Sequence, residues 1–320
     1  MKKTKNQTHK PIRKYSVVAP FFYLTTCPYT ASYAWKLIFT IIKDFFLLQM
    51  GQKLHITKRP VINVETDIDE KIPFLPNEVK AYLEFVPFFV KPMDMLKNQL
   101  GIKKAAPYLC LYLKYLTMIY KNAATIYRFC MTTTSRPKYY KSHNFRTIHF
   151  FDPHLLCVPS IHVAVSAGTH AWFRQCFKTG IINQKDAEEY LTEIKNHAVQ
   201  IVESVLFIKQ HSVNCVPLAL YMLSSTMSKS FFSAQNAADF IDELFKDSTE
   251  ISAEVRHEIL EHFYYMYDRT LLESKYSANW QDCIRHWLID YAAATGQDLS
   301  DTTNTTNTTN TTDTAGHKIL

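Results

Sequence analysis

Two histidines lie in short segments whose residue types suit phosphate chemistry. The first, His162, belongs to "VPSIHVAVSAG" (158–168), where small and β-branched residues follow a serine without any charge. Ser160 is a favourable residue at the start of a helix, and the free N–H groups of a helix N-terminus bind anions. An imidazole can exchange a proton near neutral pH. The segment therefore predicts an anion site with a proton donor; a capping serine beside a core histidine is the alternative.

The second histidine, His211, interrupts the apolar run of residues 190–227, whose pattern predicts one long helix. Burying Lys209 in such a run is costly unless an anion compensates its charge. Ser204, His211 and Cys215 are seven and then four residues apart, so they share one face of an ideal helix. Lys209 points away from that face unless the helix bends nearby. The alternative is a snorkelling lysine and a core histidine.

Two arginines precede these segments. Arg128 and Arg136 are eight residues apart, and Pro137 follows the second. A guanidinium is planar and can bind two phosphate oxygens at once, so this pair suits a phosphate site. A pair of ordinary surface arginines is the alternative.

Three ordered segments resemble the signature of a known superfamily, that of the type 2 phosphatidic acid phosphatases and vanadium haloperoxidases. They are "SRP" (135–137), "PSIH" (159–162) and "SVLFIKQHSVNC" (204–215). The segment "TDIDEKIPFLP" (66–76) also resembles the branch of lipid phosphatases and phosphotransferases. The similarity covers residues 65–225. It implies an all-α helical bundle whose site lies at the ends of helices that begin near 160 and 204.

The resemblance also implies roles for individual residues. His211 would attack phosphorus and become a phosphohistidine, and His162 would protonate the leaving oxygen. The phosphoryl oxygens would be held at matching positions by Arg128, Arg136, Ser160, the amide of Ile161, Ser204 and Lys209.

Two positions depart from the family pattern. Val205 stands where many members have arginine, and Lys209 is expected to supply that charge instead. Cys215 stands where the members have the aspartate that orients the nucleophilic histidine. A thiol is a weak hydrogen-bond acceptor, so this departure puts fast turnover in doubt.

The function implied is a phosphoesterase that hydrolyses a phosphomonoester, with lipid phosphates among the expected substrates. No cofactor is implied, and phosphate or vanadate is expected to bind the site. Two alternatives remain open. One is a lipid-headgroup phosphotransferase, and the other is a catalytically weakened protein that only binds phosphate or a lipid headgroup.

A metal site is a rival interpretation of the histidine-rich middle of the chain. The candidates are His143, His149, His154, His162 and His170, together with Asp152. Their spacing fits neither HxxxH nor HExxH, and no CxxC accompanies them. We therefore expect no metal ion.

Composition favours helices around a sizeable core. The chain has 320 residues, of which 47% are hydrophobic and only 6 are Gly, and neither a P-loop nor a Rossmann glycine pattern occurs. We expect a basic disordered arm (1–14), a helical domain (15–229), a C-terminal helical extension (230–297) and a disordered Asn/Thr-rich tail (298–320).

Charge and cysteine content indicate the surroundings of the protein. The net charge is +7, and residues 1–14 contain lysines and arginine without an acid, which suits an anionic membrane surface as partner. No nucleic-acid recognition motif occurs, so no nucleic acid is expected. The odd count of seven scattered cysteines favours reduced thiols. Without a recognisable secretory signal or apolar span, a cytoplasmic or membrane-associated location is expected.

Overall fold

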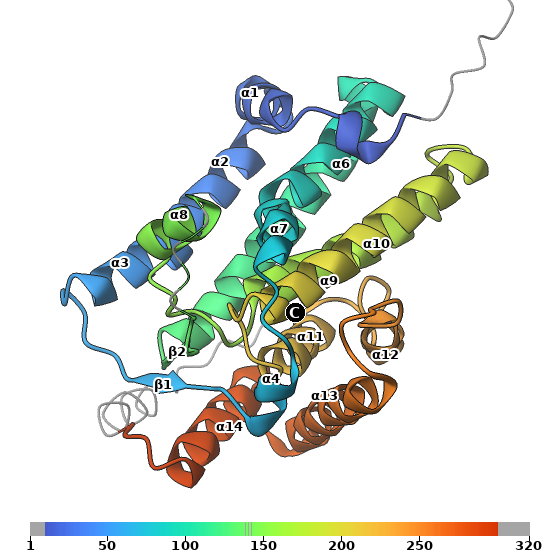
Figure 1. Cartoon of the computed structure of the whole chain (residues 1–320). Helices are drawn as coiled ribbons and strands as arrows, with labels where there is room; N and C mark the ends of the chain where they lie inside the picture. Colours follow the sequence, from blue (N-terminus) through green and yellow to red (C-terminus); the bar gives the residue numbers. More distant parts are fainter. Residues whose placement is uncertain (1–9, 138, 140, 142, 300–320) are drawn as a thin grey trace, which may run out of the picture.

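The protein is all-α, as the sequence predicts. The computed structural model describes residues 10–137, 139, 141 and 143–299, without the side chains of 149–151. Figure 1 shows its long helices lying side by side. The α-helices of the described chain, long and short, are α1 (Val18–Thr26), α2 (Ala31–Ile41), α3 (Leu47–Lys53), α4 (Asp67–Lys71), α5 (Val79–Leu83), α6 (Phe85–Leu100), α7 (Ile102–Tyr127), α8 (His143–Phe151), α9 (Ile161–Phe177), α10 (Gln184–Phe207), α11 (Cys215–Thr226), α12 (Ala234–Glu243), α13 (Ala253–Glu273) and α14 (Trp280–Ala294). Shorter turns are η1 (Ile12–Lys14), a π-helical turn η2 (Ile42–Phe46), η3 (Pro76–Glu78) and η4 (Ser274–Tyr276).

Helix α9 is buried along nearly its whole length and packs against α7, α10 and α11. Small residues permit this close packing. A Cβ added to Gly168 would lie 3.1 Å from the side chain of Ile119 and 3.2 Å from that of Tyr115, both on α7. Because protein interiors tolerate little added volume, a larger residue here would push α7 away. The N-terminus of α9 is thus held on a rigid support.

The apolar run of residues 190–227 is not one helix, so that prediction was wrong. Helix α10 ends at Phe207, residues 208–214 form a loop, and α11 begins at Cys215. Lys209 has a φ of 57°, in the left-handed region that a helix interior does not use. Pro217 lies in the first turn of α11, where its missing N–H costs no hydrogen bond. Apolar periodicity hid the break because both helices are buried.

A small parallel sheet connects distant parts of the chain. Strand β1 (Val61–Asn63) pairs with β2 (Met131–Thr133) in the register Val61↔Met131, and Thr132 forms a bridge to Leu156. The N–H of Cys157 donates to the carbonyl of Thr132 over 3.2 Å. The segment just before α9 is therefore fixed in position by the sheet.

The C-terminal helices belong to the same hydrophobic core as the rest of the described chain. Helix α13 packs on α11 and α12, and α14 packs on α11 and α7. Residues 10–14 differ from the expected disordered arm, because η1 packs against α6 and Ile12 is buried. Residues 1–9 of that arm, and 300–320 of the expected tail, lie outside the described residues.

Candidate active site

The structure brings the two singled-out histidines together. His162 lies in the first turn of α9, and His211 lies in the loop 208–214. Nδ1 of His162 is 3.2 Å from Nε2 of His211, and the hydroxyl of Ser160 is 3.3 Å from the same Nε2. Ser160 also caps α9 by accepting from the N–H of Val163. Ser160 thus both caps α9 and contacts His211.

A main-chain carbonyl fixes the orientation of the His211 ring. Nδ1 of His211 lies 3.3 Å from the carbonyl oxygen of Cys157. A carbonyl can only accept, so the ring proton of neutral His211 is at Nδ1 and the lone pair is at Nε2. The lone pair therefore faces Ser160 and His162.

The expectation that Cys215 lies one helical turn beyond His211, on the same helical face, was wrong. It assumed a continuous helix, whereas His211 is in the loop and Cys215 begins α11, with its N–H donating to the carbonyl of Ser212. Burial raises the pKa of the Cys215 thiol, which is therefore uncharged. The carbonyl of Cys157 contacts His211 in the way expected of an orienting group. Sequence reasoning missed it because a carbonyl has no sequence signal.

Burial keeps both histidines neutral. It lowers the pKa of His211 to about 4, against a smaller opposing effect of the Cys157 carbonyl. The pKa of His162 lies well below its usual value, first because of burial and then because of the neighbouring His211. Removing water disfavours the imidazolium form, and a nearby second imidazolium adds repulsion. A bound anion would act in the opposite direction and raise the pKa of both histidines.

Asp69 holds the loop that carries His211. Its carboxylate accepts from the hydroxyl of Ser212 over 2.6 Å and from the N–H of Val213 over 2.8 Å. It also completes the N-terminal cap of α4, by accepting from the N–H of Thr66. Asp69 is buried, which raises its pKa, while these hydrogen bonds act in the opposite direction. Asp69 lies in the 66–76 segment that the sequence singled out, but no role was predicted for it.

A second set of contacts holds the end of the same loop. The amide of Asn214 donates to the carbonyl of Val64, and its oxygen accepts from Nε2 of His262 over 2.8 Å. The His211 loop is thus fixed on one side by residues 64–72 and on the other by α13.

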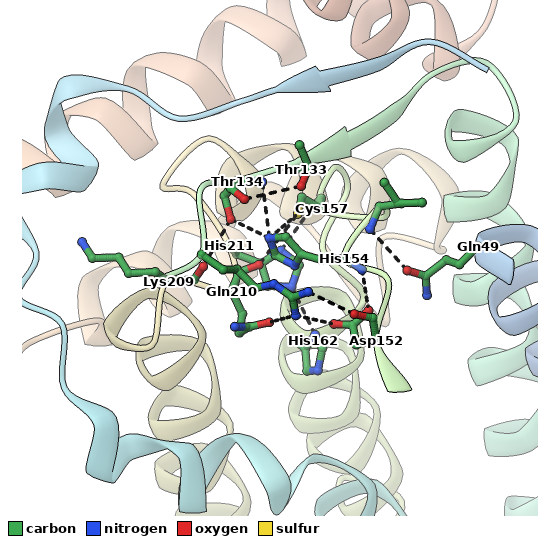
Figure 2. A network of polar contacts seen from close by, with 12 residues as sticks. Gln49, Thr133, Thr134, Asp152, His154, Cys157, His162, Lys209, Gln210 and His211 are labelled. Atoms are coloured by element: carbon green, nitrogen blue, oxygen red, sulfur yellow. Dashed lines mark hydrogen bonds and ion pairs between the residues drawn. The ribbon is translucent and has the colours of Figure 1, made fainter. Parts of the chain in front are cut away.

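The predicted phosphate-binding cations are mostly engaged elsewhere. Lys209 points away from the histidine pair (Figure 2), and its ammonium donates to the carbonyls of Asp69 and Ile72. Arg128 forms an ion pair with buried Asp44, 2.5 Å away. Ser204 is buried in α10 and donates to the carbonyl of Ile201.

Arg136 is the predicted cation that reaches the neighbourhood of the pair. Its guanidinium donates to the side chain of Gln210, next to His211, over 3.3 Å and to the carbonyl of Asp152 over 3.1 Å. The carboxylate of Asp152 is 4.0 Å away. Arg136 could turn from Gln210 to a bound anion without leaving Asp152. Ile161 begins α9, so its amide belongs to the helix N-terminus beside the histidines.

An apolar cavity of about 540 Å³ reaches His162 from the side of α1, α2 and α6. His162 and Asp152 are among the few polar residues that line it. The His162 ring lies against Tyr82 and Phe85, with ring centres 4.8 and 4.4 Å apart. A much smaller cavity of about 20 Å³, lined by both histidines, Asp152 and Gln210, adjoins His211. An apolar cavity with a few polar groups at one end suits an amphiphilic ligand.

No cluster of three or more metal-ligating side chains occurs among the described residues. His154 instead faces the hydroxyl of Thr134 over 2.7 Å (Figure 2), and the side chain of His149 is outside the description. The chain matches no family model, no curated protein and no solved structure.

Proposed function

We propose that the protein is a phosphoesterase that hydrolyses a phosphomonoester through a phosphohistidine at His211. The observation that carries this proposal is the orientation of His211: its proton faces the carbonyl of Cys157 and its lone pair faces Ser160 and His162. A neutral imidazole with a fixed tautomer is a competent nucleophile once a substrate displaces the groups that contact its lone pair, here Ser160 and His162. The positive end of α9 lies at the same point and favours a phosphate there.

In the proposed reaction the phosphoryl group binds beside Nε2 of His211 and displaces its hydrogen bonds with Ser160 and His162. Nε2 of His211 forms a bond to phosphorus as the ester oxygen leaves with the bonding electrons. Both histidines are neutral in the free protein, so the proton for the leaving oxygen arrives with a substrate monoanion and passes through His162. Water then attacks phosphorus as His162 takes a proton from it, and the bond between phosphorus and Nε2 breaks with its electrons returning to His211. The proton leaves His162 with the released phosphate, so both histidines are neutral again.

The apolar cavity supports a lipid phosphate as substrate. Its polar end is at His162, and apolar side chains of α1, α2, η2 and α6 form most of its walls. A phosphate at the pair would place an attached hydrocarbon chain inside the cavity, where burial of apolar surface favours binding. The acceptor can be water or, in a phosphotransferase, a second alcohol.

A phosphate- or headgroup-binding protein without turnover is a second candidate. The engagement of Lys209 and Arg128 away from the pair favours it, because fewer cations then offset the charge that builds up on the phosphoryl oxygens.

The experiment compares two substrates and two variants of the purified protein. Phosphate release is measured from p-nitrophenyl phosphate and from phosphatidic acid in detergent micelles. Ile38→Trp, which fills the apolar cavity, should lower kcat/KM for phosphatidic acid at least about tenfold and spare the soluble ester. Leu111→Trp, at an exposed position of α7, should change neither. No release from either substrate, with vanadate still bound, would replace the hydrolase with the binding protein.

A further inference from the structure

The exposed large apolar side chains gather in one early part of the chain. Figure 1 shows α1, α2 and α3, in blue, along one side of the molecule. Phe22 is 69% exposed, Phe39 62% and Leu47 59%, and Tyr29, Trp35 and Phe46 are also exposed. Scattered apolar residues on a surface are ordinary, but a contiguous group of this kind marks an interaction site.

On α2 and η2 these residues form a single stripe. Trp35, Phe39, Ile42 and Phe46 are separated by four, three and four residues, which places them on the same face of a helix. All four are exposed. The opposite face, with Ala34, Leu37 and Thr40, is buried in the bundle. The helix is thus apolar on both faces, but only one of these faces is buried against the rest of the protein.

The charge beside this stripe has one sign. Lys36 and Lys43 lie seven residues apart along its edge, and Lys53 and Lys58 follow; all four are exposed. The single acidic residue within 15–63 is Asp44, which is buried and paired with Arg128. The surface of this segment therefore presents apolar and aromatic groups with cations and without an exposed acid.

We propose that α1, α2, η2 and α3 form a membrane-docking face that lies in the plane of an anionic bilayer. In-plane amphipathic helices bind in this way, with their apolar stripe at the boundary of headgroups and acyl chains and lysines on the anionic lipids. Tyr29, Tyr33 and Trp35 are of the types that favour this interface. The complementary charge selects an anionic bilayer over a second copy of the chain, whose matching face would be equally cationic.

The docking face does not depend on the proposed hydrolase, although the two fit together. Phe21, Ile42 and Phe46 of the face also line the cavity that ends at His162. A lipid held in the bilayer would thus be next to the walls of that cavity. The test measures binding to lipid and does not measure phosphate release, so its outcome is independent of the proposed activity.

The experiment is co-flotation of the full chain with vesicles of phosphatidylcholine, with and without about a third of phosphatidylserine. Binding should require the anionic lipid and weaken as salt rises. Trp35→Ala/Phe39→Ala and Lys36→Glu/Lys43→Glu should each lower the apparent affinity at least about tenfold, given the contribution of each lysine near such a surface. Matched controls on the C-terminal part, Tyr265→Ala/Tyr276→Ala and Lys229→Glu/Lys275→Glu, alter exposed aromatic residues and exposed lysines and should bind as wild type.

A second measurement reports the depth of insertion. Brominated acyl chains should quench the fluorescence of wild type with vesicles, and Trp35→Phe should remove that quenching. Trp172 and Trp287 are buried, and the partly buried Trp280 begins α14, outside the docking face. Equal flotation of all variants would overturn the proposal. The proposal would also be overturned if no protein floated and the wild type were a dimer in solution that both docking-face variants made monomeric. The face would then bind a second copy of the chain.

Discussion

Nδ1 of His162 lies 3.2 Å from Nε2 of His211, although the two residues are 49 positions apart in the chain. The two histidines are positioned in different ways. His162 lies in the first turn of a buried helix, whereas His211 lies in a loop that the carboxylate of Asp69, far upstream in the sequence, holds by hydrogen bonds. We propose that these two neutral imidazoles in contact, at the positive end of a helix, bind an anion.

Vanadate should stabilise the protein, because a ligand that binds only the native state adds RT ln(1 + [L]/Kd) to the free energy of unfolding, about 2.7 kcal/mol at a hundredfold excess over Kd. Arg136→Gln should remove most of the rise in Tm, since its guanidinium lies beside Gln210 and Asp152. Arg128→Gln is the matched control and should keep the rise, because Arg128 is paired with Asp44. Equal shifts in both variants would place the anion elsewhere.

Asp69→Asn should loosen the loop that carries His211. An amide supplies one accepting oxygen where the carboxylate supplies two, so the hydroxyl of Ser212 or the N–H of Val213 loses its acceptor. A buried donor without a partner costs about 1–3 kcal/mol, which should appear as a lower free energy of unfolding in urea.

Hydrogen exchange at the amide of Val213 separates this loop effect from general damage. The exchange should accelerate in Asp69→Asn, with turnover falling at the same time. Asp67→Asn, an exposed neighbour on α4, should leave both unchanged. If the amide of Val213 exchanged as slowly in Asp69→Asn as in wild type, Asp69 would not be what holds this loop.

Cys215→Asp should not speed the reaction. The new carboxylate would be buried at the start of α11, whereas the ring of His211 is already oriented by the carbonyl of Cys157. An unpaired buried charge costs several kcal/mol, so Tm should fall clearly. Cys215→Ser, which adds no charge, should keep kcat within about twofold. A rise of kcat in Cys215→Asp would show that an orienting acid is missing at this position.

Acidification should weaken the fold through its buried histidines. Burial lowers the pKa of His262 to about 4, as it does for His170 and His211, from 6.5. Between these values the unfolded chain binds more protons than the folded one, so stability falls as the pH drops from 6.5 towards 4. For a single histidine the loss is up to about 3 kcal/mol.

The comparison between wild type and His262→Gln isolates this effect. Burial raises the pKa of Glu203 to about 7, so this residue opposes the histidines and complicates the profile of either protein alone. Glutamine can still donate to Asn214 but does not titrate. Urea unfolding at about pH 5 and about pH 7.5 should show a smaller acid loss in His262→Gln. An equal loss in both would contradict a His262 that partial burial keeps neutral.

Sequence reasoning found the helical class and the two histidines, because helical periodicity and the "PSIH" segment are local signals. It was wrong to place Ser204, His211 and Cys215 on one helical face, because that placement assumed one helix from 190 to 227. The break at Lys209 depends on contacts with residues 69 and 72, which no local pattern records. The Cys157 carbonyl and the support by Asp69 are tertiary contacts of the same kind. These contacts could therefore be recognised only from the structure.

The most direct test of the central claim is the identity of the phosphorylated residue. Rapid acid-free quenching of turnover with radiolabelled p-nitrophenyl phosphate should trap a phosphoenzyme that is acid-labile and base-stable, as a phosphoramidate bond is. His211→Asn should carry no label, while His162→Ala should keep it, since p-nitrophenolate leaves without a proton. Label that persists in His211→Asn, or maps to a different residue by mass spectrometry, would contradict the account.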